Sequence, residues 1–209
     1  TAEGEALELV KLKAIERANN SRSSELRGFR TLTSVCEQLD RARWCLDFVE
    51  RHFSYRLSGV YTFEQPGLFS PIVELLLDAG EVERARTLVE RLRFFHLTGD
   101  VSFAEMIGSD RGYRTRENHF TPIWRLDTIV RMAEGRPGEE VLESSRRMLA
   151  TIIRENPRAL LTHARALRYL GHDRRAALFA ERAIAMGLDE RREERALRLL
   201  RQLPSVVET

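Results

Sequence analysis

Residues 159–187 read ALLTHARALRYLGHDRRAALFAERAIAMG, and this stretch decides the predicted fold. Leucines and alanines recur at helical spacing until Gly171 ends the first run, and a second run of the same period ends at Gly187. Small side chains, which let two antiparallel helices approach closely, stand at Ala164, Ala176, Ala180 and Ala183. The stretch therefore predicts one helical hairpin, which is the building unit of an α-solenoid.

The remaining chain shows the same helical period between short polar breaks. Ser70–Pro71 and Thr121–Pro122 each place a capping hydroxyl before a proline at the first helical position. Residues 25–56 are helical in pattern, and ordinary helix lengths favour a hairpin that turns near residues 38–40 over one long helix. We predict an all-α chain with four segments: an amphipathic helix in 1–20, hairpins in 24–99, an irregular insertion in 100–120, and hairpins with a capping helix in 121–203.

Residues 157–187 resemble a tetratricopeptide repeat (TPR). The motif's small residue, its turn and its two later alanines correspond to Ala164, Leu170–Gly171, Ala176 and Ala183. Two earlier segments resemble the motif more weakly, through Ala42 and Ala85, and their spacing departs from its period of about 34 residues. The resemblance implies a short right-handed solenoid of stacked antiparallel hairpins with inserted loops, in which repeats of this family commonly hold peptides.

The charge pattern narrows the partner class. A formal net charge of +2 leaves no general field that attracts polyanions, which argues against nucleic acid as a partner. Many arginines have an acidic residue one helical turn away, which is typical of solvated helix faces. These predicted pairs are Glu81 with Arg84, Glu90 with Arg93, Glu143 with Arg147, and Glu194 with Arg198.

Cys36 and Cys45 are the only cysteines. On one continuous helix they would lie too far apart for a disulfide, so we expect a reduced pair and a reducing compartment. We find no signal peptide and no apolar run long enough to span a membrane, and we expect a cytoplasmic location without a membrane partner. Because the sequence begins with Thr1 instead of methionine, we expect a trimmed chain or a part of a longer protein.

The first candidate site is the polar face of the predicted helix that begins at Pro157. If the hairpin packs as TPR hairpins do, the concave side receives Arg158, Leu161, Arg165, Arg168 and Tyr169. Arg165 and Arg168 lie one turn apart, so their two guanidiniums could fork around a carboxylate or a phosphate.

The second candidate site is the insertion at 108–120, since a long loop in a compact domain often carries function. It combines cationic, aromatic and imidazole groups that suit a phosphate, a nucleobase or proton transfer: Arg111, Tyr113, Arg114, Arg116, Glu117, His119 and Phe120. A third candidate is the aromatic loop Val60–Phe69, which could line a pocket with Trp124.

We predict a protein-interaction module that captures a peptide or acidic segment in an arginine-lined concave groove. The alternative is an enzyme or small-molecule binder with a pocket formed by the loops 59–70 and 108–120. No catalytic, metal-binding or cofactor-binding motif is found, so we predict no catalytic residue, no metal and no cofactor. Three leucines near the end of the chain have two alternative roles, which are packing on the last hairpin and a homo-oligomer contact: Leu199, Leu200 and Leu203.

Overall fold

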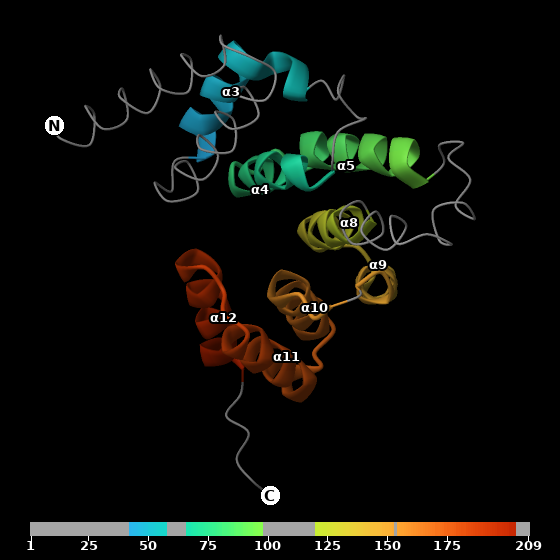
Figure 1. Ribbon diagram of the computed structural model, residues 1–209, viewed down its shortest axis with the longest axis vertical. Helices are drawn as coiled ribbons and strands as arrows, with labels where there is room; N and C mark the ends of the chain where they lie inside the picture. Colours follow the sequence, from blue (N-terminus) through green and yellow to red (C-terminus); the bar gives the residue numbers. More distant parts are fainter. Residues whose placement is uncertain (1–41, 58–65, 98–119, 153, 204–209) are drawn as a thin grey trace, which may run out of the picture. The chain divides into compact units, whose positions relative to one another are not determined.

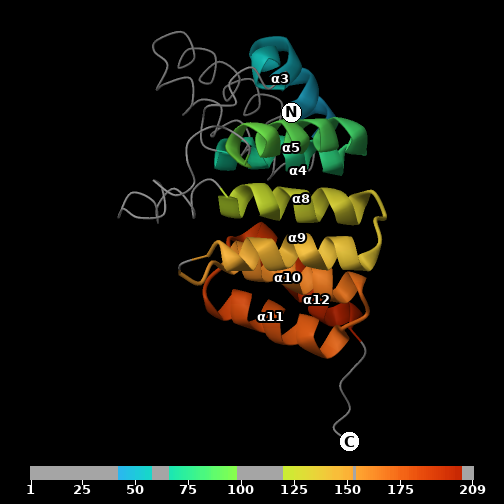
Figure 2. The same ribbon diagram turned by 90° about the vertical axis from the view of Figure 1, so that its right-hand side faces the viewer.

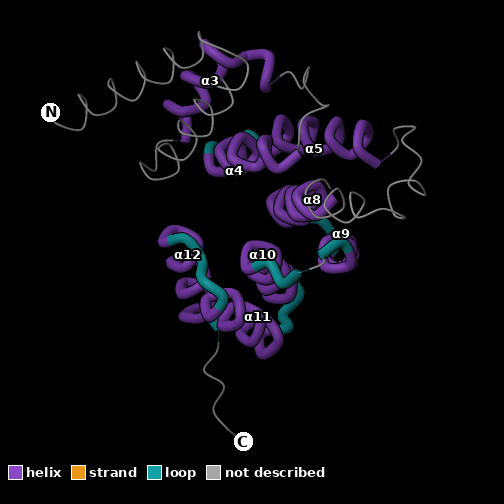
Figure 3. Tube along the Cα trace, in the orientation of Figure 1, coloured by secondary structure: helices purple, strands orange, loops and turns teal. Residues whose placement is uncertain are grey.

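A computed structural model of the chain describes residues 42–57, 66–97, 120–152 and 154–203. In these residues every regular element is a helix (Figure 3), which confirms the all-α class. The chain divides into two compact units, and the division falls within helix α5 (Val82–Leu97) after Leu88. The predicted helix in 1–20 and the predicted turn near residues 38–40 lie outside the described residues.

The first unit contains α3 (Ala42–Leu57) and α4 (Ser70–Asp78), which pack against each other. After α4 the chain turns at Gly80, whose φ of +80° is a left-handed conformation that favours glycine. The core of this unit is formed by apolar side chains of both helices: Cys45, Leu46, Phe48, Val49, Ile72, Val73, Leu75 and Leu76.

The start of α4 differs from the prediction in one respect. The loop before it ends in a 3₁₀ helix, η1 (Pro66–Phe69), which continues directly into α4. Phe69 therefore occupies the capping position in a helical conformation, without a side-chain capping hydrogen bond, and the expected cap by Ser70 is wrong. Pro71 lies in the first turn, as predicted.

Cys45 is disulfide-bonded, so the expectation of reduced cysteines is wrong. That expectation assumed that both cysteines lie on one continuous helix, where their separation would exclude a disulfide. Cys36, the only other cysteine of the chain, lies outside the described residues.

The second unit contains the end of α5, from Val89 onward, followed by a stack of antiparallel helices of thirteen residues each. They are α8 (Thr121–Ala133), α9 (Gly138–Ala150), α10 (Pro157–Tyr169), α11 (Asp173–Ala185) and α12 (Glu190–Gln202). α8 with α9 and α10 with α11 form two hairpins, and α10 also packs against α8, α9 and α12. Figure 1 shows α8, α10 and α12 along one side of this unit and α9 and α11 along the other, and Figure 2 shows its helices in successive layers.

The hairpin of α10 and α11 forms for the reasons that the sequence indicates. The side chain of Asn156 accepts hydrogen bonds from the backbone N–H groups of Arg158 and Ala159, and Pro157 fits the first turn. Gly171 turns the chain with a φ of +78°. The small residues of the contact are fully buried, as predicted: Ala164, Ala176, Ala180 and Ala183.

α12 closes the stack with its apolar face. Asp189 caps this helix by accepting a hydrogen bond from the backbone N–H of Arg192. Leu199 is buried in a cluster with Ala164 and Ala180, and Leu200 packs against the same cluster. Leu199 and Leu200 therefore pack on the last hairpin, which is one of the two roles considered for the C-terminal leucines.

Thr121 was expected to cap α8, but its hydroxyl serves another contact. Phe120 occupies the capping position without a side-chain hydrogen bond. The Thr121 Oγ1 instead lies 2.9 Å from Oγ1 of Thr151, which follows the last residue of α9. This hydrogen bond joins the start of one helix of the hairpin to the end of the other.

Candidate functional site

The predicted binding face of α10 carries only positive charge. The helix contains three arginines and no acidic residue. Four side chains reach its surface, and we call them the α10 strip: Arg158, Arg165, Arg168 and Tyr169. Leu161, which was expected on the same face, is instead buried in the core with Ala183 and Ala196.

Most of the α10 strip already contacts other parts of the second unit. The Arg158 Nη2 lies 3.7 Å from Oδ2 of Asp189, and the Arg168 Nη1 lies 2.9 Å from Oδ1 of Asp173. The Tyr169 hydroxyl donates a hydrogen bond of 2.8 Å to the carbonyl oxygen of Arg136. A ligand that binds Arg168, as predicted, therefore has to compete with Asp173 for its guanidinium.

Asp189 links the strip to the start of α12. Burial disfavours its charged form, but the hydrogen bonds and charge of Arg192, together with the charge of Arg158, lower the pKa of Asp189 below its ordinary value. Asp189 is therefore ionised at neutral pH. Its contact with Arg158 is long, and both side chains are more than two-fifths exposed, so the pair adds little stability.

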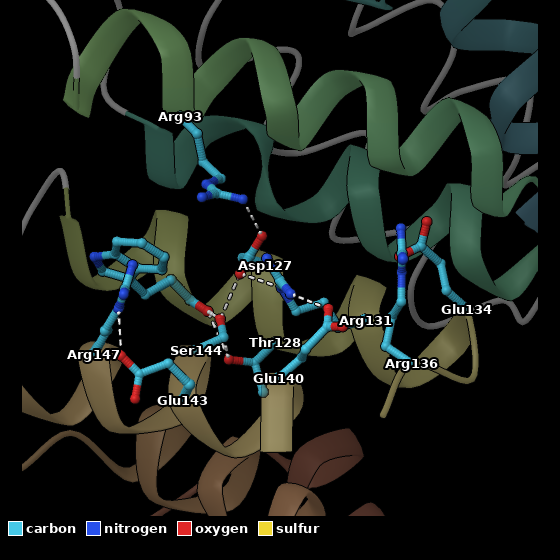
Figure 4. Close-up of polar contacts among 11 residues, drawn as sticks. Arg93, Asp127, Thr128, Arg131, Glu134, Arg136, Glu140, Glu143, Ser144 and Arg147 are labelled. Carbon is cyan, nitrogen blue, oxygen red and sulfur yellow. Dashed lines mark hydrogen bonds and ion pairs between the residues drawn. The ribbon is translucent and has the colours of Figure 1, made fainter. Parts of the chain in front are cut away.

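A second polar cluster surrounds Asp127, which is only 7% exposed (Figure 4). Its carboxylate accepts hydrogen bonds from Arg93 at 3.0 Å, from Arg131 at 2.8 Å and from the Ser144 hydroxyl at 2.6 Å. Thr128 donates to the carbonyl oxygen of Trp124 at 2.8 Å. These bonds join α5, α8 and α9 within the second unit.

Three aromatic residues of the predicted loop sites lie within the described residues: Phe69, Phe120 and Trp124. Phe120 is buried at the capping position of α8. Trp124 lies in the first turn of α8. Its ring lies 5.2 Å from the Arg93 guanidinium carbon and 5.1 Å from that of Arg147, distances typical of cation–π contacts. Arg147 is also bonded to Glu143 at 2.8 Å. Arg93 thus contacts both the Trp124 ring and the Asp127 carboxylate, which indicates a structural role for Trp124.

The other loop candidates lie in residues that the structure does not describe: Arg111, Tyr113, Arg114, Arg116, Glu117 and His119. In the aromatic loop, Phe69 is fully buried in the first unit. The predicted pocket of the loops 59–70 and 108–120 stays a prediction.

One buried contact was not found in the sequence. The Ser145 hydroxyl of α9 lies 2.8 Å from Nδ1 of His163 on α10, and the imidazole meets the ring of Phe179 edge-on at 4.7 Å. A serine beside an imidazole is the pairing of a nucleophile and a base. Ser145 is fully buried, however, so a substrate has no access to its hydroxyl.

His163 is held neutral in this environment. Burial is the largest cause that lowers the pKa of His163. The positive charges of Arg175 and Arg146 lower it further, to about 4. The neutral ring keeps its hydrogen bond to Ser145 without placing an uncompensated charge in the core. This contact fastens the first hairpin to the second.

We expect acid to destabilise the second unit through His163. The folded pKa of about 4 lies below the unfolded value near 6.5, so the unfolded chain takes up the proton first as pH falls. The stability is therefore complete above pH 6.5, and about 2 kcal/mol of it should be lost on going from pH 7.5 to 5. Urea unfolding at both values measures this loss, and a His163→Gln variant should abolish most of the difference. An equal pH dependence in wild type and variant would contradict the assignment.

Among the described residues, no group of three or more histidine, cysteine, aspartate or glutamate side chains is placed to hold a metal ion. No described helix has both the length and the apolar character that a membrane span requires. No protein-family model, no curated protein and no solved structure matches the chain. The packed hairpins themselves place the described part of the chain among the helical repeat architectures.

Proposed function

We propose that this chain is a protein-interaction module that captures an acidic segment of a partner protein on the α10 strip. The observation that carries the proposal is the charge of α10, whose surface offers three guanidiniums and a tyrosine but no carboxylate. Guanidiniums bind carboxylates through paired hydrogen bonds, and a tyrosine adds an apolar ring with a polar end. α10 is the middle helix of the stack, so a segment lying along it would pass between α8 and α12.

The existing contacts of the strip are compatible with capture. Arg165 is exposed, and the contact of Arg158 with Asp189 is long and solvated. Exchanging such a contact for a partner's carboxylate costs little free energy. Arg168 is held more closely by Asp173, which fixes its guanidinium beside the turn into α11.

The proposal is tested with a fluorescent octaglutamate peptide in an anisotropy titration. We expect saturable binding that weakens with added salt, and about tenfold weaker binding by an Arg158→Ala/Arg165→Ala variant, which corresponds to about 1.4 kcal/mol. The matched control is Arg51→Ala/Arg174→Ala, which removes the same charge from exposed positions on α3 and α11. Equal weakening in both variants, or equal binding of an octalysine peptide, would refute capture by the strip.

A further inference from the structure

α12 closes the stack with one face, and its opposite face is exposed. The helix packs against α10 and α11, and Figure 1 shows it at the edge of the second unit. Ala196 and Leu199 are buried on the packed face, whereas Leu197 is 43% exposed. We call the exposed side the α12 outer face; among the side chains that the structure describes, it consists of Leu197 and six polar residues: Glu190, Glu193, Glu194, Arg198, Arg201 and Gln202. An apolar residue thus lies near the middle of a charged surface.

The charges of the α12 outer face are divided at Leu197. Its acidic residues precede the leucine, and its arginines follow it. The dipole of a helix favours acidic residues near its start and basic residues near its end, so part of this order stabilises α12 itself. The same order also makes the face complementary to an antiparallel copy of itself, because the acidic half of each copy then lies beside the basic half of the other.

Four residues of the α12 outer face form a stripe along the helix, because they recur at helical spacing: Glu190, Glu194, Leu197 and Arg201. Within the stripe, Glu194 precedes Leu197 by three residues and Arg201 follows it by four, which is about 5 Å and about 6 Å along the axis. Two antiparallel copies of α12, related by a two-fold axis beside Leu197, therefore bring Glu194 of each copy to Arg201 of the other. The two leucines meet at the axis.

The charged groups of the stripe are available for such a contact. Arg201 is exposed and forms no ion pair with the residues that the structure describes. Glu194 is bonded to Arg198 at 2.9 Å, but both side chains are more than three-fifths exposed, so the pair adds little stability and the carboxylate can accept from a second guanidinium. A parallel arrangement would instead place Glu194 of one copy beside Glu194 of the other, where like charges repel. The charges therefore favour the antiparallel arrangement.

We propose that the α12 outer face is a self-association surface on which a second copy of this chain docks in the antiparallel orientation. Each copy contributes one face of a thirteen-residue helix with one leucine near its middle. So small an interface gives a weak dimer, and salt weakens it further because its ion pairs are exposed. The surface shares no residue with the α10 strip, so the inference goes beyond the proposed function and does not depend on it. Pairing gives one assembly two α10 strips.

Sedimentation equilibrium at chain concentrations up to the millimolar range tests the proposal. We expect wild type to show a reversible equilibrium between monomer and dimer. Glu194→Arg and Arg201→Glu each replace attraction by repulsion at both ends of the interface, so each should raise the dissociation constant of the dimer at least about tenfold. The matched control is Glu90→Arg, which makes the same charge change at an exposed position of α5 and should leave the dissociation constant unchanged. Circular dichroism checks that every variant is folded.

Charge exchange tests the orientation. In an equimolar mixture of Glu194→Arg and Arg201→Glu, both contacts again join opposite charges, so a heterodimer should form although each variant alone dimerises poorly. The doubly exchanged Glu194→Arg/Arg201→Glu chain should dimerise as wild type does, because it keeps opposite charges at both contacts. A wild type that stays monomeric, or a dimer that both single variants retain, would overturn the proposal. Loss of the dimer in the single variants without recovery in the mixture and in the doubly exchanged chain would overturn it as well.

Discussion

Replacing Asp127 with alanine should lower the free energy of unfolding of the second unit by about 3 kcal/mol. The carboxylate is buried and accepts three hydrogen bonds, two of them from the guanidiniums of Arg93 and Arg131. Removing one member of a buried ion pair costs about 3–5 kcal/mol, because the other charge loses its partner. The lower end applies here, since the two arginines are 31% and 24% exposed and water can reach them in part.

Urea unfolding followed by circular dichroism measures this loss. Glu143→Ala is the matched control, because Glu143 also binds an arginine but both partners are more than half exposed. That variant should differ from wild type by less than about 0.5 kcal/mol. The free energy of unfolding of Asp127→Asn should lie between those of Asp127→Ala and Glu143→Ala, since an amide oxygen still accepts hydrogen bonds. If Asp127→Ala were as stable as Glu143→Ala, the cluster would not hold the helices together.

Replacing Ala180 with leucine should destabilise the second unit by about 3 kcal/mol. Ala180 is fully buried where α11 meets α10 and α12, in a cluster with Ala164 and Leu199. Three added carbons have no space there, so the helices must separate or the side chain must take a strained rotamer. We expect a loss of stability at the upper end of the range for overpacked cores, because Ala180 lies where three helices meet.

Thermal unfolding compares this variant with Ala185→Leu. Ala185 is the last residue of α11 and is exposed, so the same substitution adds the same carbons without crowding. We expect the control to unfold within a few degrees of wild type and Ala180→Leu to unfold well below it. A neutral Ala180→Leu would show that α10 and α11 do not pack as closely as their alanines indicate.

The hairpins could be predicted because their signals are local. Alanines at helical spacing, a proline in the first turn of α8 and of α10, and a glycine in the turn of each hairpin all predict the structure that the packing adopts. Gly171 and Gly187 both take a positive φ, as the turns they were assigned require. The capping roles of Ser70 and Thr121 were wrong because what precedes a helix, such as η1 before α4, is decided by neighbouring segments.

Ion pairs show the same limit. Glu143 with Arg147 and Glu194 with Arg198 form as predicted, because helical spacing alone brings them together. Arg84 and Arg93 instead bind Glu50 and Asp127 on other helices. Spacing within one helix cannot reveal a carboxylate that another helix brings beside the arginine.

Candidate sites could likewise be predicted only where a single helix carries their residues. The α10 strip was predictable because one helix carries all of its residues. The contact of Ser145 with His163 joins different helices, and no motif or spacing marks it in the sequence. Such sites become visible only when helices are placed side by side.

The most direct measurement for the proposed function is an NMR titration of the ¹⁵N-labelled chain with octaglutamate, observing the arginine side-chain Nε–Hε groups. Capture on the α10 strip predicts saturable shifts of Arg158 and Arg165, and these shifts should be lost when salt abolishes binding. Saturable shifts confined to arginines outside the strip, or no saturable shift at all, would contradict it.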